Sequence, residues 1–233
     1  MPTGSLPDLA NFPALGAGCV PDTIRTYDAL MQIVLDQVES AGAPFLIGIA
    51  GPPATGKSTL AKRLVTDLNT AGTKACFCPM DGFHLTNAQL DAQDLRDAKG
   101  RIDTFDVEAF VAAVQRLTAK DSFWWPVYSR QRHDPIPEGT SIFGSERVYV
   151  IEGNYVLSEA EPWRAVGDAF TLRIFADAPD EVLRQRLLKR HQKSGRTQSE
   201  ALEKIDRTDM PNAQTIRNER QVEDILFYER ADD

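Results

Sequence analysis

The stretch FLIGIAGPPATGKS, residues 45–58, decides the fold. Its first half is a continuous apolar run that ends in glycine, and a helical pattern, STLAKRLVTDL, begins at Ser58. Residues 51–58 match G-x-x-x-x-G-K-[ST] in the strand-to-helix context that this pattern requires. The sequence therefore predicts a phosphate-binding loop between a buried strand and a helix.

The chemistry of this loop follows from its residue types. Pro52 and Pro53 have no N–H group, so the donors to phosphate must come from residues 54–58 and from the start of the helix. Lys57 would neutralise the terminal phosphates, and the hydroxyl of Ser58 would bind Mg²⁺. The predicted ATP-contacting residues are Gly51, Ala54, Thr55, Gly56, Lys57, Ser58 and Thr59.

A second acid at the end of another strand is expected, because P-loop proteins hold magnesium between the loop and such a residue. Glu152 ends the apolar run RVYVIEG and is the predicted metal ligand. Asp177, after LRIFA, is a weaker competitor. The chain has no Asn-Lys-x-Asp segment of the kind that reads guanine, which favours ATP over GTP.

Further apolar runs alternate with helical patterns along the chain. Continuous rather than alternating apolar runs indicate strands that are covered on both faces. Strands that alternate with helices predict a mainly parallel sheet of five strands in a three-layer αβα sandwich of the P-loop NTPase type. The predicted strands are 45–51, 74–80, 147–153, 169–176 and 224–229, and the predicted helices are 21–41, 57–71, 106–119, 179–193 and 198–208.

The chain is expected to form one domain with two additions. Residues 1–20, rich in Pro, Gly and Ala, are predicted to be a flexible arm, and residues 21–233 form the domain. Residues 82–146 are too long for one crossover and contain prolines that exclude a long helix. They are read as an excursion over the carboxyl ends of the strands, where ligands bind in open α/β sheets.

A basic segment, residues 183–196, reverses the acidic balance of the chain. One interpretation is a solvated amphipathic helix. The other is a lid over residues 184–197, whose arginines stabilise the charge on a phosphate during transfer. Arg186 and Arg190 lie four residues apart on one helix face and are the first candidates for this role.

The motifs together resemble one superfamily. In order along the chain stand the phosphate loop, MDGFHL at 80–85, PVYSRQRHD at 126–134 and IEGNY at 151–155. This order is similar to that of the uridine kinase, phosphoribulokinase and bacterial pantothenate kinase superfamily. Within it the chain looks most like the branch described as nucleoside kinase-like or as fructose transport system kinases.

This resemblance implies ATP-dependent phosphorylation of a hydroxyl group on a small metabolite. It implies that Asp81 is the catalytic aspartate and Glu152 the acid near magnesium, and that Tyr128 and His133 contact the substrate. It places Arg186 and Arg190 in the lid, and Asn212, within MPNA, near the adenine.

The predicted mechanism has Asp81 orient the substrate hydroxyl and take its proton late, because positioning carries most of phosphoryl transfer. His84, Tyr128, Arg130 and His133 would line the acceptor pocket, although His84 could equally be a structural histidine. Sugars such as fructose, pantothenate and nucleosides remain rival acceptors. The alternative function is a nucleotide-dependent switch or regulatory ATPase that has no small acceptor.

Composition narrows the class of partner. The formal net charge of -8 argues against a nucleic-acid binder, and no apolar stretch approaches the ~20 residues of a membrane helix. Three cysteines, Cys19, Cys76 and Cys78, are read as buried thiols in a reducing compartment. We therefore expect a cytoplasmic enzyme that needs ATP and Mg²⁺ and that acts on a small molecule. The oligomeric state stays open, with a homodimer as one option.

Overall fold

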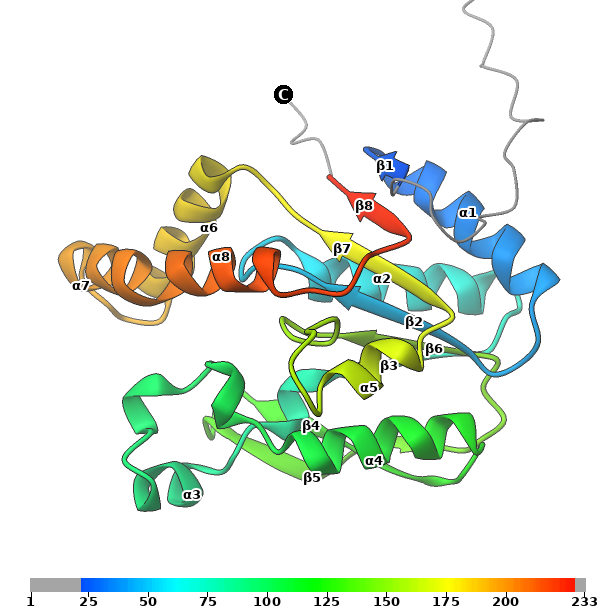
Figure 1. The fold of residues 1–233 in the computed structure, drawn as a ribbon, viewed down its shortest axis with the longest axis horizontal. Coiled ribbons are helices and arrows are strands. Elements are labelled where there is room, and N and C mark those ends of the chain that lie inside the picture. The colour runs from blue at the N-terminus through cyan, green and yellow to red at the C-terminus, as the bar shows by residue number, and fades with distance from the viewer. Residues whose placement is uncertain (1–21, 229–233) are drawn as a thin grey trace, which may run out of the picture.

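A sheet of six parallel strands forms the centre of the protein (Figure 1). The computed structural model describes residues 22–228, so the predicted flexible arm, residues 1–20, and Cys19 lie outside the described part. The strand order is β1-β8-β7-β2-β6-β3. The strands are β1 (Asp22–Ile24), β2 (Phe45–Ala50), β3 (Ala75–Pro79), β6 (Val148–Glu152), β7 (Leu172–Ala176) and β8 (Ile225–Phe227).

Helices cover both faces of this sheet, which explains the continuous apolar runs of its strands. On β2, Ile47 and Ile49 pack with helices α1 and α2, while Leu46 and Ala50 pack with α4, α5 and α8 on the other face. The three-layer α/β fold predicted from the sequence is confirmed. The helices are α1 (Tyr27–Ser40), α2 (Lys57–Thr70), α3 (Asn87–Ala92), α4 (Val107–Thr118), α5 (Arg164–Asp168), α6 (Asp180–Lys193), α7 (Gln198–Lys204) and α8 (Met210–Asn218).

The prediction of five strands was wrong by one, at the N-terminal edge. A helix was expected over 21–41, but residues 22–24 form strand β1, which pairs in parallel with β8. The helix begins only at Tyr27, because Thr26 has extended backbone and its hydroxyl caps the helix by accepting from the N–H of Ala29. A three-residue strand is too short to show a period, so only the pairing with β8 reveals it.

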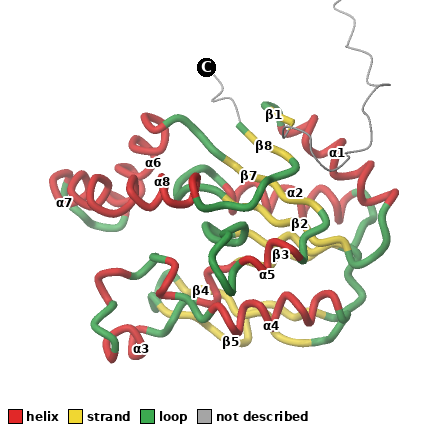
Figure 2. Tube along the Cα trace, viewed as in Figure 1, coloured by secondary structure: helices red, strands yellow, loops and turns green. Residues whose placement is uncertain are grey.

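The excursion, residues 82–146, contains a two-stranded antiparallel hairpin beside α4 (Figure 2). Its strands are β4 (Phe123–Ser129) and β5 (Asp134–Ile142), and its register shifts between Trp125 and Val127, on either side of a proline. Three short 3₁₀ turns complete the excursion: η1 (Met80–Phe83), η2 (Arg96–Ala98) and η3 (Ile102–Thr104).

The hairpin is fastened to the end of β3. The buried indole N–H of Trp125 donates to the Pro79 carbonyl at 3.0 Å. Gly82 lies against the backbone of Pro126, where a Cβ atom would stand 2.1 Å from the carbonyl oxygen. Glycine at position 82 is therefore needed for close packing, and this packing fixes the backbone that carries Asp81.

Strand β3 does not pair with β2. Strand β6 stands between them and is paired with both. The carboxyl ends of β2, β6 and β3 therefore follow one another along one edge of the sheet. This edge carries the phosphate loop, Glu152 and Asp81 in that order.

Candidate functional site

The phosphate loop leaves β2 through a close contact with the neighbouring strand. Gly51 has a φ of 146°, and a Cβ atom there would lie 1.9 Å from the carbonyl oxygen of Ala176 at the end of β7. A side chain at this position would force the two strands apart. The glycine thus lets the loop turn tightly over the end of the sheet.

Two side chains of the loop donate hydrogen bonds to the same backbone carbonyl. The oxygen of Pro52 accepts hydrogen bonds from the Thr55 hydroxyl at 3.0 Å and from the Lys57 ammonium at 2.8 Å. Burial lowers the pKa of Lys57 to about 8, although Glu152 and Asp81 both act in the opposite direction. A buried cation held by one neutral carbonyl is well placed to exchange this partner for an anionic phosphate.

An oxygen pair lies beside this lysine. The hydroxyl of Ser58 donates to Oε1 of Glu152 at 2.9 Å, between the start of α2 and the end of β6. Burial raises the pKa of Glu152, opposed by the charge of Lys57. A hydroxyl and a carboxylate are oxygen ligands of the kind Mg²⁺ prefers, and Mg²⁺ commonly takes its remaining ligands from water and phosphate. Both residues predicted to bind the metal are therefore brought together and fit this ion.

Asp177, the weaker candidate for the metal ligand, forms an ion pair with Arg217. Its carboxylate accepts from the guanidinium of Arg217 at 2.8 and 2.9 Å, and from the hydroxyl of Tyr228 at 3.2 Å. The residue is 8% exposed. These contacts join the end of β7 to α8 and β8, so the structure gives Asp177 a role in packing.

Asp81 follows β3 in the turn η1, and its side chain is half exposed. The Nδ1 atom of His84 lies 2.9 Å from the backbone oxygen of Asp81 and 4.0 Å from its carboxylate. The His84 ring is packed between two others, with ring centres 4.0 Å from Phe105 and 5.0 Å from Tyr128. Burial lowers the pKa of His84, so this imidazole is neutral at pH 7.

Lys99 lies beside Tyr128, and the sequence did not reveal it. Its ammonium lies 5.0 Å from the centre of the Tyr128 ring. It donates to Oδ1 of Asn87 at 2.8 Å and to the backbone oxygen of His133 at 2.6 Å. Lys99 thereby joins α3, the η2 turn and the end of the hairpin. A lysine in a polar loop carries no spacing signal, so only the fold identifies it.

The other predicted acceptor residues lie at the tip of the hairpin. Arg130 and His133 are exposed, and the structure records no hydrogen bond or ion pair from either side chain within residues 22–228. His133 has a φ of 54°, in the turn between the two strands. Of the four residues predicted to line the acceptor pocket, His84 and Tyr128 contact each other, while these two stand apart in solvent.

The two lid arginines differ in position. Nη1 of Arg186 lies 3.4 Å from the carbonyl oxygens of both Ala54 and Thr55, so this side chain already reaches the phosphate loop. Arg190 is exposed, but its charge is among those that lower the pKa of Lys57. The helix α6 carries both residues and continues through a turn into α7, and the lid over 184–197 stays a prediction.

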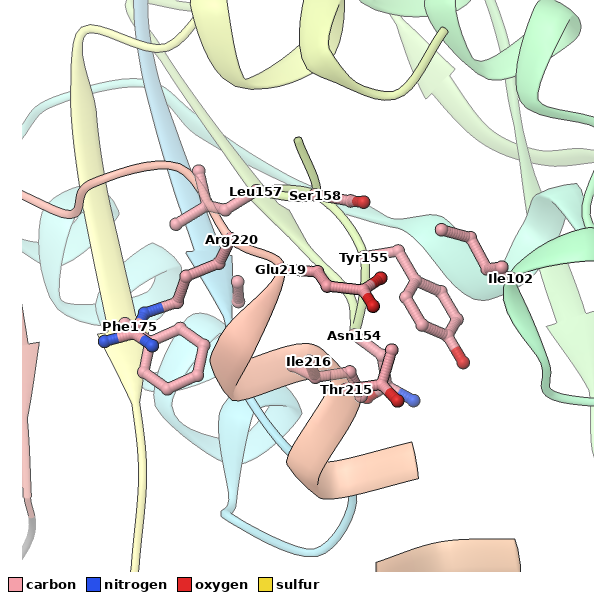
Figure 3. Close-up of a pocket in the computed structure, with 11 residues that line it drawn as sticks. Ile102, Asn154, Tyr155, Leu157, Ser158, Phe175, Thr215, Ile216, Glu219 and Arg220 are labelled. Carbon is pink, nitrogen blue, oxygen red and sulfur yellow. The ribbon is translucent and has the colours of Figure 1, made fainter. Parts of the chain in front are cut away.

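Asn212 does not contact the phosphate loop in the structure. It lies 2.7 Å from the hydroxyl of Tyr155, which is also 2.8 Å from the backbone oxygen of Gly100. Figure 3 shows the small hollow beside this contact, between α8 and the residues after β6. Its volume of about 10 Å³ suits no more than a water molecule. Asn212 does not line this hollow, and the adenine contact predicted for it stays a prediction.

A phosphate-loop motif, a buried lysine and an aspartate at one sheet edge are the features of a P-loop kinase. Within that class, the chain belongs to the phosphoribulokinase / uridine kinase family, because the model of that family matches residues 46–229. The family resemblance read from the sequence is confirmed.

Individual relatives agree with this assignment. A candidate uridine kinase of Schizosaccharomyces pombe is 30% identical over 220 residues, which cover 90% of this chain and 92% of that one. A pantothenate kinase of Chelativorans sp. is 31% identical over 66% of this chain and 51% of its own length. The crystal structure of a candidate fructose transport system kinase from Silicibacter sp. superposes with a TM-score of 0.81 at 32% identity, over 86% of this chain and 98% of that one.

No helix between residues 22 and 228 combines the length and apolar character that a membrane crossing requires.

Proposed function

We propose that this protein transfers the γ-phosphate of ATP to a hydroxyl group of a small metabolite, with Mg²⁺ bound between Ser58 and Glu152. The observation that carries the proposal is the 2.9 Å contact between these two side chains beside the buried Lys57. The cation would neutralise charge on the phosphates and help to orient them. Asp81 follows β3, which is two strands away from β2 at the same sheet edge. An acceptor bound at Asp81 can reach the terminal phosphate there.

Each residue then has one task. Backbone N–H groups of residues 54–58 bind the phosphates, and Lys57 exchanges its bond to Pro52 for a phosphate oxygen. Asp81 accepts a hydrogen bond from the acceptor hydroxyl and takes its proton late in the transfer. Arg190, whose charge already acts on Lys57, stabilises the phosphate as it moves. Closure of the α6–α7 lid excludes water from the site.

The pocket around His84 and Tyr128 limits the class of acceptor. It offers a neutral imidazole, a phenol hydroxyl and the ammonium of Lys99. These groups suit a polyhydroxylated or carboxylate-bearing molecule of small size. Relatives are named as candidate uridine, pantothenate and fructose transport system kinases, and we propose sugars, pantothenate and nucleosides as the acceptors to test.

A screen of ATP consumption identifies the acceptor. The full chain with Mg²⁺ is assayed for ADP formation against sugars, nucleosides, pantothenate and glycerate, each with the Lys57→Met variant as a blank. The proposal expects one class to raise ADP formation well above the acceptor-free rate. Equal rates with and without every acceptor would instead favour the alternative of a regulatory ATPase or nucleotide switch.

A further inference from the structure

A buried histidine of α6 takes no part in the reaction proposed above. His191 is 7% exposed and follows Leu183 and Leu187 at steps of four residues, so the three side chains share one buried stripe of the helix. A third leucine would continue this stripe. An imidazole in its place needs hydrogen-bond partners, because burying a polar group without them is costly. The partners of His191 therefore indicate what the residue does.

Both nitrogens of the His191 ring have a partner. Nε2 lies 2.7 Å from Oδ2 of Asp209, and Nδ1 lies 3.5 Å from Nη1 of Arg196. Because a guanidinium can only donate, Arg196 faces the lone pair of Nδ1, and Nε2 is the nitrogen that donates to Asp209. Arg196 lies in the link between α6 and α7. His191 thus joins α6 both to this link and to Asp209.

Asp209 ends an irregular turn between two helices. Ile205–Asp209 form the π turn η4, which separates α7 from α8, although these helices lie nearly in line (Figure 1). Turns of this kind often occur at functional sites. Helix α6 contacts both α7 and η4, and α8 is packed on the sheet through Ile216. The bond from His191 to Asp209 therefore ties α6 to a segment that is fixed on the sheet.

A second polar contact joins α6 to the same π turn, but at the surface. Arg184 donates to Asp206 at 2.5 Å, and their side chains are 47% and 58% exposed. Exposed ion pairs contribute little to stability, whereas a buried polar group that loses its partner is costly. The apolar contacts of the leucine stripe have no direction of their own. The bond between His191 and Asp209 is thus the contact that distinguishes one register of α6 from another.

We propose that His191 is a positioning residue, whose buried bond to Asp209 fixes the register of α6 and thereby places the two lid arginines at the phosphates. The inference rests on the proposed function, because the arginines act on the phosphate that is transferred. Arg190 and Arg186 precede His191 by one and five residues, so they point about 100° and 140° away from it around the helix. Nη1 of Arg186 already lies 3.4 Å from the carbonyl oxygen of Ala54. A shift of α6 by one turn would move this group by about 5.4 Å and break the contact.

Replacing both partners by leucine separates positioning from stability. In His191→Leu/Asp209→Leu the buried acid disappears together with its donor, so the melting temperature should stay close to that of the wild type. Turnover should nonetheless fall by about 10- to 100-fold, as expected for catalytic groups misplaced by about 1 Å. The KM of the acceptor should not change. More ADP should form without phosphorylation of the acceptor, because a misplaced lid admits water.

Three single variants complete the comparison. His191→Gln keeps an N–H donor towards Asp209 and should retain turnover within about 3-fold of the wild type. His191→Leu should lower both turnover and the melting temperature, because Asp209 then lacks its donor. Arg184→Gln is the matched control, since it breaks the exposed contact between the same elements, and should leave turnover unchanged.

Three outcomes of these kinetic measurements would overturn the proposal. The first is wild-type turnover in the double variant, which would give His191 and Asp209 a role in packing alone. The second is turnover in His191→Gln as low as in His191→Leu. The third is an equal loss in Arg184→Gln, which would mean that any weakened contact of α6 has the same effect.

Hydrogen exchange tests the bond without an acceptor. Amide exchange in α6 and in β2 is followed by mass spectrometry in the full chain with Mg²⁺ and AMP-PNP, an ATP analogue that is not hydrolysed. The double variant should exchange faster in α6 and as in the wild type in β2. This result would support the positioning role even if no acceptor raised ADP formation. Wild-type exchange in α6 would overturn it even if the protein proved to be an active kinase.

Discussion

The phosphate loop and the acceptor excursion meet at one sheet edge, but their polar groups are held in different ways. Thr55, Lys57 and Glu152 are at most 8% exposed and are bonded within the site. In the excursion, the Asp81 side chain is 54% exposed, and Arg130 and His133 lie in solvent. The phosphate half is therefore formed before a ligand arrives, whereas much of the acceptor half rests on surface loops.

This difference has a consequence for energetics. Charges in a buried, water-poor site interact more strongly than those at a surface, so the loop can supply most of the electrostatic stabilisation of the reaction. Exposed side chains in loops can be exchanged with little effect on folding. The family can thus retain one phosphate chemistry while its members act on different acceptors.

The largest effect should come from the buried lysine. Lys57→Met removes the charge beside the transferred phosphate and should reduce acceptor-dependent turnover by on the order of 10³-fold. The same change removes a buried cation, so the free energy of unfolding should rise. Steady-state kinetics and urea denaturation measure the two quantities. If Lys57→Met lowers both activity and the free energy of unfolding, burial of the Lys57 charge does not destabilise the folded protein.

The pH dependence of that stability gain has a definite sign. The pKa of Lys57 falls from 10.5 to about 8 on folding, so between these values the unfolded chain binds the extra proton. Wild-type stability from this group therefore rises as the pH rises through this window. The advantage of Lys57→Met should be greatest at pH 7 and shrink towards pH 10. Urea denaturation of both proteins at pH 7 and at pH 10 measures this advantage. A difference in unfolding free energy that is the same at both pH values would contradict the lowered pKa of Lys57.

A smaller effect is expected at the predicted magnesium ligand. Glu152→Gln keeps the size of the side chain but removes the negative charge, and should raise the Mg²⁺ concentration for half-maximal activity by about 10- to 100-fold. Asp177→Asn, which alters the acid paired with Arg217, should leave this concentration unchanged and lower the melting temperature instead. A reversed pattern would assign the metal to Asp177.

The acceptor pocket should respond in KM. Tyr128→Ala removes the ring between His84 and Lys99 and should raise the KM of the acceptor about 10-fold, as expected for the loss of one ring contact. The KM of ATP should not change. Trp124→Ala, in the same strand with a 51% exposed side chain, serves as the control. Similar increases in the acceptor KM for both variants would show that the hairpin as a whole, rather than the Tyr128 ring, is responsible.

The smallest effect belongs to the tip of the hairpin. Arg130→Ala should change the acceptor KM by no more than about 3-fold and leave the melting temperature within experimental error, because its side chain is exposed. Thermal melting and acceptor titrations measure both. A loss as large as that of Tyr128→Ala would mean that the tip folds over the acceptor during turnover, which would reduce the contrast between the two halves.

The phosphate loop could be predicted from the sequence, whereas the structure of the acceptor excursion could not. The phosphate loop is a local pattern, and the contact between Ser58 and Glu152 follows once both strands are known to end at one edge. The hairpin was not recognised, because Pro126, Pro135 and Pro137 interrupt the regular alternation that marks a strand and argued only against a helix. Strand β1 was too short to show a period. The position of Lys99 and the bond from His191 to Asp209 depend on tertiary contacts that no spacing predicts.

Asp81 provides the most direct test of the central claim, that one sheet edge joins a preformed phosphate site to a separate acceptor site. Asp81→Asn is compared with the wild type for AMP-PNP affinity and for turnover with the acceptor found in the screen. We predict a 10²- to 10⁴-fold fall in turnover, the range for loss of a catalytic base, with nucleotide affinity unchanged within about 3-fold. Turnover close to that of the wild type would contradict it.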